Sequence, residues 1–166
     1  GKIENGIVKA NQTVYVKNYF DESKEEDIFD YIPPQKNNQI FTPRSVVRKM
    51  VDELEIQNPG CFDDPSKTFA DLYMKSGQYI TEIVKRLYRS RKMKELLPDG
   101  EERVRHILRK QVYGMAPTRI IYLIATNYIL GFDSELKGET KNFVEADAAE
   151  AAKAGTLEAL VEKHFS

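Results

Sequence analysis

The sequence predicts an α/β protein in which helices cover both faces of a parallel sheet. Short apolar runs at residues 68–70, 111–113 and 142–146 are typical of strands, and stretches with helical spacing separate them. Strands that alternate with helices at these distances are joined by right-handed crossovers and lie parallel. We therefore expect a three-layer sheet in residues 39–166, preceded by an approach segment in residues 1–38.

Composition narrows the classes of function. The chain has 166 residues, of which 41% are hydrophobic and 31% are charged, which is typical of one soluble domain. Its net charge of −1 provides no general attraction to nucleic acid or to anionic membranes. The single cysteine, Cys61, excludes an internal disulfide and a multi-cysteine zinc site, and His106 and His164 lack metal-ligand spacing. No apolar run is long enough to span a bilayer and no signal peptide is recognisable, so we expect a cytoplasmic location.

The first predicted elements precede the sheet. Residues 13–16 are predicted to form one short strand, and Ser23 begins a capping box that opens a short acidic helix. Thr42 is expected to be the N-cap of a longer helix with Pro43 at its first position. That helix ends at the Asn-Pro-Gly run of residues 58–60. Its apolar face is formed by Val46, Val47, Met50, Val51 and Leu54.

The next stretch joins a strand to a helix through a glycine turn. The strand ends at Asp71, and the turn closes on Ser76 and Gly77. The apolar stripe of the helix is formed by Ile80, Ile83, Val84, Leu87 and Tyr88. The first N–H groups of such a helix lie beside the carboxyl edge of the sheet, where cofactors bind in open α/β folds. An ordinary connection between a strand and a helix needs the same turn, so this pattern alone leaves both interpretations open.

The second half of the chain continues the alternation. The basic cluster that follows is Arg89, Arg91, Lys92 and Lys94. Its position at a helix C-terminus explains it without a phosphate ligand. A helix over residues 101–110 leads to the second strand, which is expected to end at Gly114. The next helix begins at Pro117 and ends at Gly131, and its apolar composition predicts burial on most sides. The third strand ends at Asp147, and Ala-rich helical turns follow.

Four segments, taken in order, resemble a known family. They are the QIFTP run of residues 39–43, the turn of residues 71–77, the turn at Gly114, and the strand end at Ala146 and Asp147. Over residues 37–165 this order resembles the adenine-specific DNA methyltransferase modules of bacterial restriction-modification enzymes. The 71–77 turn is similar to the family's D-P-A-C-G-S-G loop, and the Gly114 turn is similar to its G-x-(D/E) segment. The resemblance implies the first half of a three-layer, Rossmann-like methyltransferase fold.

The resemblance also implies S-adenosylmethionine as the cofactor. In the family the first loop wraps the methionine part, the acid after the second strand bonds the ribose hydroxyls, and the acid after the third strand bonds the adenine amino group. Carboxylates suit these positions because hydroxyls and amines are hydrogen-bond donors. Carried over to this sequence, the cofactor-binding residues are Thr42, Pro43, Asp71, Lys75, Ser76, Gly77, Gly114, Ala116 and Asp147.

The sequence departs from the family's pattern inside these segments. The residues that replace the small residues of the loop are Leu72, Tyr73, Met74 and Lys75. Lys75 stands in place of a glycine, which can take positive φ and lets a ligand approach the backbone. Ala116 stands where the ribose-binding acid is expected, and Asp147 also begins a capping box. Cofactor binding by this fragment is therefore expected to be weak or absent, or to use substitutes such as Lys75 or Glu82.

The family's catalytic (N/D/S)-P-P-(Y/F/W) segment, which holds the flipped-out adenine, has no counterpart here. Pro33 and Pro34 lie between Ile32 and Gln35 and follow an acidic helix, so they are not that motif. We therefore expect a fragment that is inactive alone and holds no catalytic residue. Its expected partners are double-stranded DNA and the catalytic and target-recognition domains of the same polypeptide.

Two other functions are compatible with parts of the pattern. A degenerate methylase-like module used for docking would keep the fold without binding a cofactor, and Lys75 and Ala116 favour it. A nicotinamide-dependent oxidoreductase is disfavoured, because no G-x-G-x-x-G follows any strand and no acid follows the second strand.

Overall fold

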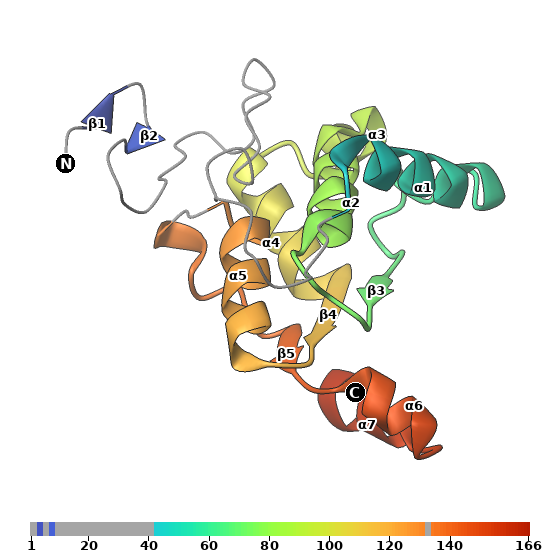
Figure 1. The fold of residues 1–166 in the computed structure, drawn as a ribbon. Helices are drawn as coiled ribbons and strands as arrows, with labels where there is room; N and C mark the ends of the chain where they lie inside the picture. Colours follow the sequence, from blue (N-terminus) through green and yellow to red (C-terminus); the bar gives the residue numbers. More distant parts are fainter. Residues whose placement is uncertain (1–2, 5–6, 9–41, 132–133) are drawn as a thin grey trace.

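The computed structural model describes residues 3–4, 7–8, 42–131 and 134–166 (Figure 1). The strand predicted at residues 13–16 and the helix predicted to begin at Ser23 lie outside these ranges. Near the N-terminus, β1 (Ile3–Glu4) pairs antiparallel with β2 (Ile7–Val8). Among the described residues, no helix is both long and apolar enough to cross a membrane.

Strands and helices alternate along the rest of the chain. The strands of the main sheet are β3 (Phe69–Asp71), β4 (Val112–Ala116) and β5 (Phe143–Glu145). The helices are α1 (Arg44–Gln57), α2 (Gln78–Arg89), α3 (Arg91–Leu96), α4 (Gly100–Lys110), α5 (Arg119–Ile129), α6 (Ala148–Lys153) and α7 (Leu157–Phe165), with one 3-10 turn at Ser134–Leu136. The predicted alternation of strands and helices is confirmed in this part of the chain, and α3 and the 3-10 turn are additional to it.

The three strands lie in the order β3-β4-β5 and both pairs are parallel. Asp71 is opposite Gly114, and Ala116 is opposite Glu145. Because the strands are parallel and paired in this register, their carboxyl ends lie at a common edge. The prediction that the second strand ends at Gly114 was wrong, because the ladder continues past it: the N–H of Ala146 donates to the carbonyl of Ala116 at 2.8 Å.

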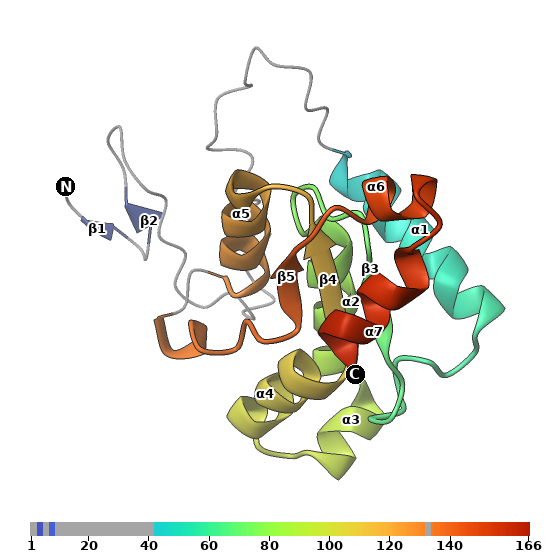
Figure 2. The ribbon, with the colours of Figure 1, turned by 90° about the horizontal axis from the view of Figure 1, so that it is seen from below.

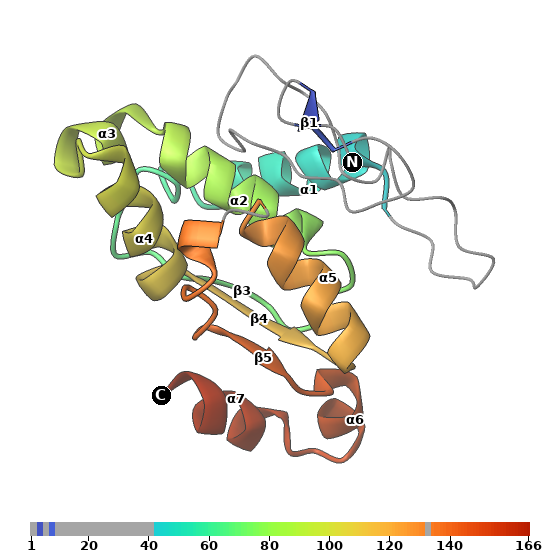
Figure 3. The ribbon, with the colours of Figure 1, turned by 90° about the vertical axis from the view of Figure 1, so that its left-hand side faces the viewer.

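Helices cover both faces of the sheet, which confirms the mixed α/β architecture of a partial Rossmann-like fold. Figure 3 shows α2 and α5 on one face and α6 and α7 on the other, and Figure 2 shows α7 across the strands. The ring of Phe165 on α7 meets that of Tyr113 on β4, with centroids 5.2 Å apart. The N-termini of α1, α2 and α5 lie on the side where the strands end (Figure 3).

The core lies between the sheet and the first helical layer. The predicted stripe of α2 is buried at Ile80, Ile83, Val84 and Leu87. The apolar residues of α4 are also buried, at Val104, Ile107 and Leu108. Fully burying such a side chain contributes about 1.5–3 kcal/mol, so these two stripes contribute strongly to the packing of α2 and α4.

Helix α1 packs along α2, but its start and its apolar face differ from the prediction. Pro43, not Thr42, is the N-cap, because Pro43 has an extended ψ of 141° and its carbonyl accepts the N–H of Val46 and Val47. Val47 and Val51 are buried, whereas the side chains of Val46 and Met50 are 41% and 54% exposed. Only one side of α1 therefore faces the core. Arg86 of α2 holds that side through Asp52 at 2.6 Å, Glu55 at 3.3 Å and the carbonyl of Arg48 at 3.3 Å, all on α1.

Helix α5 is less buried than its composition predicted. Ile120 and Leu123 are 71% and 44% exposed, because the described elements that pack on α5, which are α2 and the sheet, cover its inner side. Thr118 is its N-cap and accepts the N–H of Ile121 at 3.3 Å, so Pro117 precedes the helix. Helix α3 was not predicted, and Ser90 caps it by accepting the N–H of Met93 at 3.2 Å.

A buried carboxylate ties the segment before β5 to α4. Glu139 binds both Arg105 and Arg109 of α4 at 2.7 Å. The hydrogen bond from Arg109, helped by Arg105, lowers the pKa of Glu139 below its usual 4.5, although burial opposes this. The ionised form of Glu139 therefore supports the fold.

Candidate functional site

The turn between β3 and α2 stands at the carboxyl edge of the sheet. Oδ1 of Asp71 accepts the N–H of Tyr73 at 3.0 Å. The N–H of Met74 donates to the carbonyl of Met115 at 2.9 Å, which fastens the turn to the end of β4. Gly77 is the N-cap of α2 and has no side chain to accept an N–H of the first turn. The helix therefore begins with N–H groups that suit water or an anionic ligand group.

Gly77 is required for two independent reasons. Its φ of +80° lies in the left-handed region that side chains other than glycine rarely adopt. A Cβ at this position would also lie 2.8 Å from the carbonyl oxygen and 3.1 Å from the Cα of Ala125 on α5. Ser76 is buried beside it. This end of the turn is thus closed against α5 and places the start of α2.

Asp71 has the electrostatics expected of a ligand-binding group. Burial raises the pKa of its carboxyl above the usual 3.8, and the hydrogen bond from Tyr73 only partly offsets this. In the ranges that the structure describes, no lysine or arginine forms an ion pair with Asp71. A half-buried carboxylate without a cation, at the end of a parallel strand, suits a ligand that carries a cation or hydrogen-bond donors.

Gly114 lies inside β4, opposite Asp71 and two residues before the end of the strand, and its missing side chain serves packing. A Cβ on Gly114 would overlap Sδ of Met74 and would lie 2.7 Å from its Cε and 3.1 Å from Phe143. Met74 is fully buried in this space. The large residue that departs from the family's loop is therefore accommodated by the missing side chain of Gly114.

Two acids lie where β5 ends. Glu145, the last residue of β5, is exposed beside the buried Ala116 of β4. Asp147 is exposed as well, and its Oδ1 accepts the N–H of Glu150 at 2.9 Å, so it is the N-cap of α6 as the capping pattern predicted. Glu145 was not among the residues predicted from the sequence. Residues i and i+2 of a strand share a face, so the pattern around Asp147 contained a signal that could have found it.

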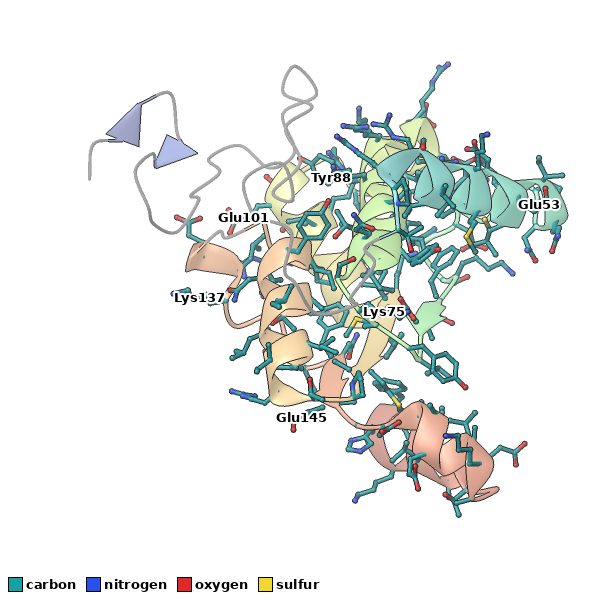
Figure 4. The ribbon with its side chains drawn as sticks, in the orientation of Figure 1. Glu53, Lys75, Tyr88, Glu101, Lys137 and Glu145 are labelled. Carbon is teal, nitrogen blue, oxygen red and sulfur yellow. The ribbon has the colours of Figure 1, made fainter. Side chains whose placement is uncertain are left out.

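The remaining predicted residues are divided between the edge and other places. Lys75 is exposed on the turn before α2 and, with Glu145, is labelled in Figure 4. Thr42 and Pro43 precede α1, whose N-terminus is on the same side of the molecule (Figure 3). Glu82 binds Arg86 at 3.1 Å in the second turn of α2 and takes no part in the edge. Asp71, Ala116 and Glu145 thus end the three parallel strands, Lys75 lies on the turn after Asp71, and Asp147 follows Glu145 by two residues.

A separate hollow of about 300 Å³ lies at the opposite end of β3. It is lined by Leu54, Asn58, Pro59, Cys61, Lys67, Thr68 and Phe69, none of which belongs to the predicted site. Burial raises the pKa of the Cys61 thiol, so this cysteine is a poor nucleophile. No group of three or more metal-binding side chains occurs within the described residues.

Comparison with known proteins agrees with this geometry at a coarse level. Over 103 residues, which are 62% of this chain, the sequence is 25% identical to a protein of Mycoplasma pneumoniae named "Uncharacterized adenine-specific methylase". The match covers 24% of that protein, so the chain spans about a quarter of its length. No protein-family model matches the chain. No solved structure matches it. Sequence similarity and a parallel α/β sheet together support a methyltransferase-like relationship.

Proposed function

We propose that this chain forms the S-adenosylmethionine-binding part of an adenine-specific DNA methyltransferase of the restriction-modification kind. The observation that carries the proposal is the Asp71 carboxylate, which has no cation in the described part of the chain and lies beside the uncapped start of α2. The name of the similar protein supports adenine as the methylated base. Double-stranded DNA and the catalytic part of a longer polypeptide are the partners in this proposal.

The residues at the edge fit the chemical groups of the cofactor. Asp71 would accept the ammonium group, whose charge compensates the raised pKa of this carboxyl. The first N–H groups of α2 and the exposed Lys75 would bind the carboxylate. Asp147 would accept the adenine amino group with the oxygen that does not cap α6. The cofactor supplies an activated methyl group, so the protein has to position it and to exclude water.

The first experiment is a calorimetric titration of the 166-residue chain with S-adenosylmethionine. We expect weak but saturable binding, and we expect Asp71→Asn to weaken it at least about tenfold, as loss of a charge-assisted hydrogen bond would. Glu158→Gln, a change to an exposed carboxylate on α7, is the matched control and should bind like the unaltered chain. Absence of binding at millimolar cofactor would refute the proposal for this chain.

The substrate is tested separately. Methyl transfer from labelled S-adenosylmethionine to adenine in double-stranded DNA should be observed with the full-length polypeptide and not with the 166-residue chain. Transfer to cytosine, to RNA or to protein would leave cofactor binding in place and refute the proposed substrate.

The alternative function is a docking module with a methyltransferase-like fold and no cofactor. Two observations favour it: Met74 fills the space beside Gly114, and Ala116 is buried where the family has an acid. Under this alternative neither the unaltered chain nor Asp71→Asn responds to the cofactor. The same titration therefore decides between the two functions.

A further inference from the structure

At the end of the second strand of the sheet, where the family has an acid, this chain has Ala116, and a glutamate lies beside it on the next strand. Ala116 ends β4, and its partner on β5 is Glu145. The N–H of Ala146 donates to the carbonyl of Ala116 at 2.8 Å, so the pairing holds at the very end of the strands. Adjacent strands are about 4.8 Å apart, a gap that a glutamate side chain spans.

The pleat of β5 sets the direction of Glu145. Phe143 and Glu145 are two residues apart and so point to the same face of the sheet. Phe143 is buried and would lie 3.1 Å from a Cβ on Gly114, which places both side chains on the face of Gly114 and Ala116. Glu145 is the next residue outward on that face, and it is exposed.

The carboxylate of Glu145 has no structural task in the described ranges. Asp71 accepts the N–H of Tyr73, and Asp147 accepts the N–H of Glu150. For Glu145, the described residues provide neither a hydrogen bond nor an ion pair. An acid at the carboxyl edge of an open α/β sheet is suited to accept the vicinal hydroxyls of a ribose.

We propose that Glu145, acting across the β4–β5 pair, is the ribose-binding acid of this chain in place of the residue at 116. The assignment rests on the proposed function, because it needs an adenosyl ligand at this edge. It explains how Ala116 can lack a carboxylate while the site keeps specificity for a ribonucleoside. It also makes Glu145 a binding residue, not a catalytic one.

The test pairs a protein change with a ligand change. S-adenosylhomocysteine and its 2′,3′-dideoxy analogue are titrated into the unaltered chain, into Glu145→Gln, and into Glu158→Gln as the control. We expect the unaltered chain and the control to bind the dideoxy analogue about tenfold or more weakly than S-adenosylhomocysteine, as loss of hydrogen bonds to a carboxylate would cause. The affinity of Glu145→Gln for S-adenosylhomocysteine should fall by a similar factor. In this variant the affinities for S-adenosylhomocysteine and for the dideoxy analogue should then differ by less than about twofold.

The outcomes separate this assignment from the proposed function. If Glu145→Gln binds S-adenosylhomocysteine like the unaltered chain, the assignment is overturned and the proposed function stands. If Glu145→Gln lowers the affinity for both ligands, but the affinity ratio between S-adenosylhomocysteine and its dideoxy analogue stays as in the unaltered chain, Glu145 contacts another part of the nucleoside. The ribose assignment is then overturned. If the unaltered chain binds neither ligand, both the proposed function and the assignment fall.

Discussion

Gly77 and Gly60 form a matched pair that tests how the turn before α2 is built. Their φ angles are nearly the same, +80° and +77°. Their surroundings differ: a Cβ on Gly77 would lie 2.8 Å from the carbonyl oxygen of Ala125, whereas a Cβ on Gly60 would have nothing within 4 Å. Replacing each glycine by alanine therefore imposes the same backbone strain and only in one case a steric clash.

The magnitudes follow from these two terms. Left-handed backbone at a residue with a Cβ costs about 1–2 kcal/mol, and this applies to both variants. In Gly77→Ala the obstructing atoms are backbone atoms of α5, which cannot rotate away as a flexible side chain can. Overpacking of this kind costs about 1–3 kcal/mol more. We expect Gly77→Ala to be less stable than Gly60→Ala by about 2 kcal/mol, or ~4–8 °C in Tm for a domain of this size.

The assay is urea denaturation followed by far-UV circular dichroism, with thermal melts as a second measurement. A native spectrum in the absence of urea shows that each variant folds before its stability is compared. Equal losses for the two variants would contradict the packing of α2 against α5 at Ala125. A loss for Gly77→Ala that is smaller than that for Gly60→Ala would contradict the left-handed N-cap as well.

Three further predictions concern the edge and its support. The first is a double-mutant cycle measured by urea denaturation. Gly114→Ala should lower the free energy of unfolding by about 1–3 kcal/mol because the new Cβ displaces Met74, and this loss should largely vanish when Met74→Ala is already present. Losses that simply add would contradict the contact between the two residues. The pKa of Asp71 in the folded chain lies above 3.8, so the protonated form stabilises the fold and this stabilisation is lost as pH rises. Asp71→Asn should therefore raise Tm at pH 7 by about 2–4 °C. In thermal melts below pH 3.8 this gain should disappear. The pKa of Glu139 in the folded chain lies below 4.5, so its stabilisation of the fold is present at neutral pH and is lost as pH falls through this folded pKa. Glu139→Gln should lower the free energy of unfolding at pH 7 by about 1.5–3 kcal/mol, measured by urea denaturation. On acidification this variant should lose less stability than the unaltered chain.

The elements that could be predicted are those whose signal is local. The stripes of α2 and α4 repeat at helical spacing over three turns, and both are buried as the spacing requires. Helix α3 has six residues, too few for a periodic signal, and depends on the cap at Ser90. The start of α1 was misplaced by one residue because Thr42 and Pro43 both suit the end of a helix, and only the backbone angles distinguish them.

The errors at the candidate site have a common cause, which is contact between residues far apart in sequence. Gly114 suggested a strand end because glycine weakens strands, but here its missing side chain makes room for Met74, which lies in another part of the chain. Glu145 escaped notice because its relation to Ala116 exists only once β4 and β5 are paired in register. The turn that holds Asp71, Ser76 and Gly77 could be predicted because it is local in the sequence.

Stability explains some residues of this edge and fails to explain others. Gly77, Gly114 and Met74 are required by packing, and a docking module without a cofactor would need them equally. The ionised carboxylate of Asp71 opposes folding, and that of Glu145 is bound by nothing in the described ranges. The proposed ligand would account for both acids. If Asp71→Asn raises Tm and leaves the affinity for S-adenosylmethionine unchanged, the raised pKa of Asp71 is no sign of a binding site, and the docking function becomes the better account of the chain.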